Sequence, residues 1–159
     1  MSLVGVYEGL TEASLQALAA RFAASLSSDA MSSDPSLSWP LLIEMQGPLG
    51  AGKTTFVRFL LKALGHNGSV KSPTYSLLEP YPDILYGVFH WDLYRLGHPE
   101  ELEYLGFRDL MVDRHCCIVE WADKGAGYLL PAQLVIQLEP DSETTRRLSI
   151  SSDAGPDAS

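Results

Sequence analysis

The stretch LLIEMQGPLGAGKTTFVRFLLKALG, residues 41–65, is the most informative part of the sequence about the fold. It opens with an apolar run at 41–45, a length typical of a buried strand. A glycine-rich turn follows, and apolar residues then recur at helical spacing over 54–64 until Gly65, a helix-ending residue. Strand, glycine-rich turn and helix in this order indicate an α/β domain that binds an anion at the turn.

The turn GPLGAGKT, residues 47–54, matches the phosphate-loop pattern G-x-x-x-x-G-K-[ST] at every fixed position. Glycines allow backbone N–H groups to surround an anion, and the helix that begins here adds its positive end. The lysine brings a point charge to the terminal phosphates, and the threonine hydroxyl is a hard oxygen ligand for Mg²⁺. The predicted nucleotide contacts in this turn are Gly47, Gly50, Ala51, Gly52, Lys53, Thr54 and Thr55.

Two acids are candidates for the magnesium-holding partner that such a loop needs. Asp92 ends the β-branched and aromatic run 84–91, and Glu120 ends the apolar run 116–119. Strands at these runs would deliver both acids to the carboxyl edge of the sheet, where ligands bind in open α/β folds. The segment Ser-Pro-Thr-Tyr, 72–75, follows the helix predicted after the phosphate loop. A segment that senses the terminal phosphate often lies at this point, and Thr74 is the candidate sensing residue.

The overall charge restricts the class of partner. The chain has 159 residues, 20 of them acidic and 11 Lys or Arg, with a net charge of −9. Such a chain is not expected to bind the nucleic-acid backbone or an anionic membrane by itself. No apolar run approaches the roughly 20 residues of a spanning helix, and residues 1–10 lack the basic segment of a signal peptide. The adjacent cysteines at 116 and 117 fit buried positions in a reduced, cytoplasmic protein.

The remaining segments complete one α/β domain over residues 1–150. We expect an edge strand at 3–8, a helix capped by Thr11 that ends near 27, and a flexible loop at 27–38. A short helix should open at Pro99, and 134–138 and 148–150 should form a final strand pair. The small, polar residues 151–159 predict a disordered tail. The predicted fold is a single P-loop NTPase-like domain with a mixed, mostly parallel sheet, flanking helices and a short β-hairpin.

Several motifs together resemble the TsaE family, once called YjeE. They are GPLGAGKTT (47–55), KSPTYSLLEPY (71–81), FHWDLYRL (89–96), PEELEYLGFRDL (99–110), IVEWADKG (118–125) and LLP (129–131). The resemblance covers most of residues 40–131. The combination of S-P-T-Y, H-x-D-L-Y-R and V-E-W in this order is far more specific than the phosphate loop alone.

The resemblance implies an ATPase that binds ATP and Mg²⁺, is weak alone and acts with the proteins TsaB and TsaD. That complex transfers a threonylcarbamoyl group to the adenosine next to the anticodon of tRNA, so this subunit would meet tRNA only indirectly. The implied catalytic residues are Lys53 for phosphate, Glu120 for the metal and Asp92 for water or metal. The resemblance also implies Thr54 as a metal ligand, Thr74 in a switch segment, Trp121 as support for the site, and Thr11 and Glu12 near the base.

Two other interpretations stay open. A small-molecule kinase uses the same loop and fold, but such enzymes usually carry several arginines in a lid, and here only Arg95 and Arg108 lie in a suitable region. A nucleotide-gated protein-binding module with negligible turnover would need the same residues as an ATPase. The absence of an N/T-K-x-D motif from the sequence leans against GTP.

Overall fold

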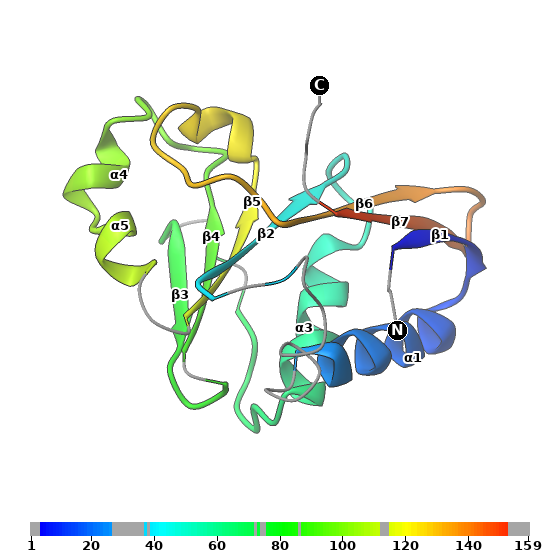
Figure 1. Cartoon of the computed structure of the whole chain (residues 1–159). Helices are drawn as coiled ribbons and strands as arrows, with labels where there is room; N and C mark the ends of the chain where they lie inside the picture. Colours follow the sequence, from blue (N-terminus) through cyan, green and yellow to red (C-terminus); the bar gives the residue numbers. More distant parts are fainter. Residues whose placement is uncertain are drawn as a thin grey trace.

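The structure is a computed structural model that describes residues 4–26, 37, 39–71, 73, 76–85, 87–111 and 115–152. In this part of the chain the strands form one seven-stranded sheet in the order β1-β7-β6-β2-β5-β4-β3 (Figure 1). The strands are β1 (Gly5–Leu10), β2 (Leu41–Gln46), β3 (Leu78–Tyr81), β4 (Val88–Asp92), β5 (Cys116–Glu120), β6 (Leu134–Pro140) and β7 (Arg146–Ser152). The helices are α1 (Glu12–Ser25), α3 (Lys53–Ala63), α4 (Glu101–Tyr104), α5 (Phe107–Leu110) and the 3-10 helix η1 (Ala122–Gly125).

The sheet has a parallel centre and antiparallel margins. Strands β6, β2, β5 and β4 pair in parallel, whereas β1 with β7, β7 with β6, and β4 with β3 pair antiparallel. Every residue of β4 and β5 is buried, as expected for parallel strands that are covered on both faces. The carboxyl ends of β2, β4 and β5 therefore meet at one edge of the sheet.

Side chains alternate between two apolar layers along the central strands. Helices α1 and α3 cover one face, where Phe22 and Phe56 meet edge to face with ring centroids 6.2 Å apart. Helices α4 and α5 cover the other face, where Phe107 packs on Trp91. In Figure 1, α4 and α5 lie beside β3 and β4 at the left, and α1 and α3 lie below the sheet. Residues at even positions of β4 and β5 face the α3 side, which also carries the phosphate-loop turn.

Helix α1 begins where the sequence predicts. The Thr11 hydroxyl accepts a hydrogen bond from the Ser14 N–H at 3.2 Å, and the Ser14 hydroxyl accepts one from the Thr11 N–H at 2.7 Å. This reciprocal pair is a capping box, which satisfies two N–H groups at the helix start. The cap fixes the start of α1 close to the phosphate-loop helix, against which α1 packs.

The strand predicted at 84–91 is shorter than expected. Strand β4 begins only at Val88. Leu85 adopts a left-handed φ of 49°, and the Gly87 N–H donates to the Ile84 carbonyl at 3.0 Å, which closes a turn. The turn joins β3 to β4 as the short hairpin of the sheet, and Asp92 remains the last strand residue.

Two other predicted boundaries were wrong. The short helix starts at Glu101 rather than at Pro99, with Glu100 as its N-cap. Strand β7 continues to Ser152, which pairs with Leu134 of β6, so the first two residues of the predicted tail belong to the sheet. Residues 153–159, and 27–36 and 38 of the predicted loop, lie outside the described residues.

The cysteines occupy the interior, as predicted. Cys116 and Cys117 are buried in β5 with free thiols, and burial raises the pKa of the Cys117 thiol to about 12. Among the described helices, none is both long and apolar enough to cross a membrane.

Candidate functional site

The shape of the turn between β2 and α3 requires two of its glycines. Gly47 has a φ of 143°, and a Cβ at this position would collide with the Leu138 carbonyl of strand β6. Gly52 has a φ of 102° and is the N-cap of α3, so the helix begins at Lys53. The first N–H groups of a helix have no partner within it, so this turn and helix end together can bind an anion.

Lys53 is buried although it carries a charge, with only 6% of its side chain exposed. Its Nζ donates to the Gly47 carbonyl at 2.7 Å and lies 3.9 Å from Glu120 Oε1. The same ammonium lies 4.6 Å from the centroid of the Trp121 ring. One side chain thus links the phosphate-loop turn, the end of β5 and the residue that follows β5.

Asp92 and Glu120 are register partners at the carboxyl ends of β4 and β5. Both are buried, with 9% and 4% of their surfaces exposed. Burial raises the pKa of the Asp92 carboxyl, and the charge of Glu120 adds to the rise, while the Tyr94 N–H, which donates to Asp92 Oδ1 at 3.1 Å, opposes it. Neighbouring buried carboxylates disfavour each other's charge, and a cation at this point would relieve that repulsion.

A buried histidine that the sequence analysis did not single out contacts Glu120 directly. His90 is fully buried, and its Nε2–H donates to Glu120 Oε2 at 2.6 Å, because a carboxylate can only accept. Its Nδ1 has no hydrogen-bond partner among the described residues. Strand periodicity could have revealed this residue, since side chains two apart on β4 share a face and His90 precedes Asp92 by two.

The predicted residues converge on a pocket of about 310 Å³, here called the phosphate pocket. It is lined by Leu49, Gly50, Gly52, Lys53, Thr54, Thr55, Asp92, Glu120, Trp121 and Arg146. Gly47 lines an adjoining hollow with Lys53 and Trp121, and Ala51 is buried behind the turn. Most of the predicted phosphate and metal contacts therefore share one cavity, although their roles stay predictions.

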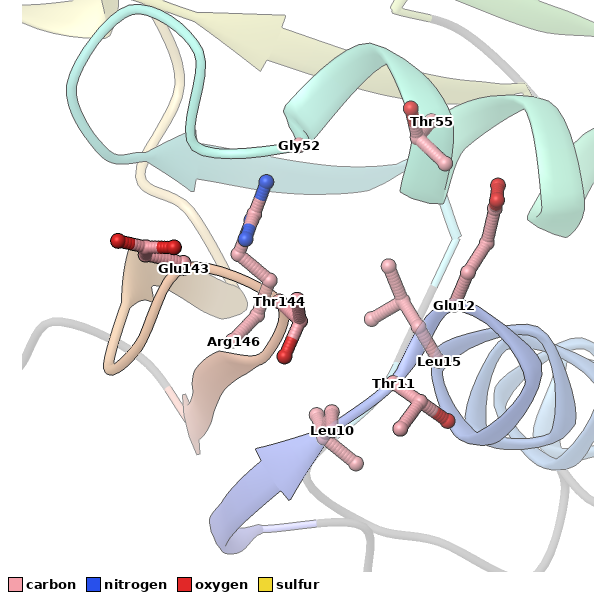
Figure 2. A pocket seen from close by; sticks show the side chains of 9 residues that line it. All are labelled: Leu10, Thr11, Glu12, Leu15, Gly52, Thr55, Glu143, Thr144 and Arg146. Atoms are coloured by element: carbon pink, nitrogen blue, oxygen red, sulfur yellow. The ribbon is translucent and has the colours of Figure 1, made fainter.

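A second pocket of about 190 Å³, here called the side pocket, adjoins the first. Figure 2 shows its walls: the start of α1 with Thr11 and Glu12, the β6–β7 turn with Glu143 and Thr144, and the start of α3 with Thr55. Its other lining residues are Leu10, Leu15, Gly52 and Arg146. The two pockets have Gly52, Thr55 and Arg146 in common.

Not every predicted residue is placed in these pockets. Thr74, the candidate in the switch segment, lies outside the described residues. Arg95 and Arg108 are exposed, and they line neither pocket. Arg146 does line both, but no local pattern marked it, because it reaches the turn from 95 residues away along the chain.

The donor set fits a magnesium ion. The phosphate pocket gathers the Thr54 hydroxyl and the carboxylates of Asp92 and Glu120, all hard oxygen donors. Magnesium usually takes one or two carboxylates and completes its shell with water and substrate phosphates. Burial is the main cause of the raised pKa of Asp92, and the neighbouring Glu120 charge adds to it, so a bound cation would favour the charged form of this carboxyl.

Comparison with known proteins identifies the family. The sequence model described as "Threonylcarbamoyl adenosine biosynthesis protein TsaE" matches residues 10–148. This chain belongs to the TsaE family. The matched region includes the residues that line both pockets, and it extends well beyond the motifs at 47–131 on which the resemblance was based.

Individual TsaE proteins match a large part of the chain. It is 44% identical over 99 residues to the tRNA threonylcarbamoyladenosine biosynthesis protein TsaE of Haemophilus influenzae, covering 62% of this chain and 63% of that protein. The protein of the same name from Rickettsia felis is 36% identical over 110 residues, covering 69% of this chain and 64% of that protein. The match therefore spans less than two thirds of the length of these relatives.

A solved structure has the same fold. The crystal structure of YdiB from Bacillus subtilis superposes with a TM-score of 0.69 at 22% identity, covering 96% of this chain and 88% of that chain. At this identity the likeness concerns the fold alone. It confirms the predicted α/β fold with a mixed sheet whose core strands are mostly parallel.

We predict that His90→Ala destabilises this TsaE-family protein. The change removes the donor to Glu120 Oε2 in a buried site, and a buried polar group that loses its partner costs about 1–3 kcal/mol. Urea unfolding followed by tryptophan fluorescence measures the loss. His98→Ala, at an exposed histidine, is the matched control and should leave the midpoint in place. An unchanged midpoint for His90→Ala would show that the buried pair contributes nothing to stability.

Proposed function

We propose that this chain is the ATP-binding and ATP-hydrolysing subunit for threonylcarbamoyl modification of the adenosine next to the anticodon in tRNA. The observation that supports this most is the convergence of Lys53, Asp92 and Glu120 on one pocket in a chain of the TsaE family. Relatives of this chain are named for tRNA threonylcarbamoyladenosine biosynthesis, and we extend that role to this chain.

The triphosphate would occupy the phosphate pocket. Backbone N–H groups of the turn and of the first turn of α3 would donate to its oxygens. The Lys53 ammonium, which bonds to the Gly47 carbonyl in this structure, would bond to the terminal phosphates. The base would enter the side pocket beside Thr11, where α1 begins.

Thr54 and Glu120 would hold Mg²⁺, and the bound ion would offset the negative charge on the phosphates. Glu120 is suited to this role because His90 fixes its Oε2, while its Oε1 is 3.9 Å from Lys53 and makes no short bond to it. His90 on β4 and Lys53 on α3 therefore contact the Glu120 carboxylate from two sides, and they would orient it before a ligand binds.

Asp92 would orient the attacking water. Its Oδ1 accepts from the Tyr94 N–H, which leaves Oδ2 to accept a hydrogen bond from water beside the terminal phosphate. With water held by Asp92 and phosphate charge offset by Lys53, the site supplies positioning and electrostatic stabilisation, the two contributions that phosphoryl transfer needs.

The charge of the chain supports a division of labour with partner proteins. A net charge of −9 disfavours direct binding to tRNA, so we propose that TsaB and TsaD supply the RNA-binding and transferring surfaces in the cytoplasm. Thr74 keeps its proposed place in a segment that senses the terminal phosphate and couples nucleotide state to these partners.

Lys53→Ala should weaken ATP binding roughly tenfold to a hundredfold, the usual range for a lost charge-assisted hydrogen bond. Titration calorimetry with ATP and Mg²⁺ measures the affinity. Lys62→Ala, at an exposed lysine in the last turn of the same helix, is the matched control and should bind as wild type does. Equal affinities for Lys53→Ala and wild type would remove the phosphate loop from the proposal.

Glu120→Gln should keep most ATP affinity but lose most hydrolysis. The amide preserves shape and can still accept from His90, whereas it is a poor ligand for Mg²⁺. Single-turnover phosphate release and calorimetry separate the two effects, with Asp92→Asn measured in parallel. If Glu120→Gln hydrolyses normally and Asp92→Asn does not, the metal-holding acid is on β4 instead of β5.

Partner proteins should accelerate turnover. We expect slow phosphate release from the isolated chain, faster release with TsaB and TsaD, and tighter assembly with ATP than with ADP, because the terminal phosphate would order the segment proposed to sense it. Phosphate release and light scattering with ATP, a non-hydrolysable analogue and ADP test this. Nucleotide-gated assembly without any stimulated release would favour a binding module over an ATPase. Equal assembly in all three states, with no stimulated release, would exclude a nucleotide-gated partner cycle.

A further inference from the structure

A guanidinium from the far end of the chain lies against the phosphate loop. Arg146, the first residue of β7, donates from Nε to the Ala51 carbonyl at 3.0 Å and from Nη1 to the Thr145 carbonyl at 3.2 Å. Among the described residues, its Nη2 has no hydrogen-bond partner. Figure 2 shows the side chain rising from the hairpin toward Gly52. Two bonds therefore fix the guanidinium and leave one donor edge open.

The position of this open edge is specific. Arg146, Gly52 and Thr55 are the three residues that line both the phosphate pocket and the side pocket, so the two cavities meet at them. Any nucleotide that places phosphates in one cavity and its base in the other must pass its sugar–phosphate junction through this point. The group at that junction which a guanidinium binds best is a phosphate.

The charges around the side pocket favour the same orientation of the ligand. Glu12 and Glu143 line this pocket, and both are exposed carboxylates that repel a phosphate. The phosphate pocket also contains two carboxylates, Asp92 and Glu120, but beside them it holds Lys53 and the N-terminus of α3, both of which attract an anion. The anion is therefore drawn to the phosphate pocket, and Arg146 is the cation nearest to the boundary that the innermost phosphate must occupy.

We infer that Arg146 is a nucleotide-binding residue whose Nη2 edge contacts the α-phosphate. This inference rests on the proposed function, since it takes the ligand to be a nucleoside di- or triphosphate. The β6–β7 hairpin then contributes directly to the site. Its Arg146 contacts the phosphate attached to the ribose, while Lys53 contacts the terminal phosphates.

The test is ADP affinity by calorimetry for wild type, Arg146→Ala, Arg146→Lys and Arg147→Ala. Arg147 is the matched control, because it is the next residue on the opposite face of β7 and pairs with Glu8 and Glu139. We expect Arg146→Ala to bind ADP roughly tenfold to a hundredfold more weakly. Arg147→Ala should stay within about twofold of wild type, as is usual for an exposed ion pair. An unchanged affinity for Arg146→Ala overturns the inference.

A second measurement separates contact from bracing, because Arg146 also holds the Ala51 carbonyl. Phosphorus NMR of ADP bound at saturation should show a displaced α-phosphorus resonance in Arg146→Ala and an unchanged β-phosphorus resonance. Equal displacement of both resonances would mean that Arg146 only shapes the loop, and would overturn the inference. If Arg146→Ala fails to fold, Arg146→Lys replaces it in both measurements. A single lysine ammonium cannot bond to the Ala51 carbonyl and to the phosphate at the same time. Wild type that binds no ADP contradicts the proposed function, whereas wild-type binding with an indifferent Arg146 contradicts only this inference.

Discussion

The site depends on one buried charge, the ammonium of Lys53. Burying a charge is costly unless oxygens or an aromatic face replace its water, and here the Gly47 carbonyl, Glu120 and the Trp121 ring do so. These groups come from the turn after β2 and from the end of β5, which pair in parallel. The ammonium is therefore accommodated only when the central strands hold this register, and the fold and the site share one requirement.

Glu120 connects the Lys53 ammonium to a second buried side chain. It lies between the Lys53 ammonium and the fully buried His90, so each carboxylate oxygen faces a different nitrogen. Among the described residues, Asp92, its register partner, accepts a hydrogen bond from the Tyr94 backbone N–H alone, and burial raises its pKa. Two carboxylates at neighbouring strand ends thus have different environments. This difference is the physical reason for proposing that Glu120 holds the metal ion and that Asp92 orients the water.

Three distant segments build the space beside the phosphate loop. The start of α1, the start of α3 and the β6–β7 turn surround the side pocket, and Arg146 ties the last of these to Ala51. The capping box at Thr11 and the tight fit of Gly47 against the Leu138 carbonyl hold two of the walls in place. The hairpin is therefore part of the site and more than an edge that closes the sheet.

Local sequence patterns predicted the glycine turn before α3, the cap at Thr11, and the acids at the ends of β4 and β5. Each follows from backbone preferences and strand periodicity within a few residues. These patterns placed the start of β4 and the end of β7 less well, because a left-handed Leu85 and pairing with β6 set them. The contacts of His90 with Glu120 and of Arg146 with Ala51 could not be predicted in this way, since both depend on which strands lie side by side. That order is set by pairings between distant segments, which no local pattern encodes.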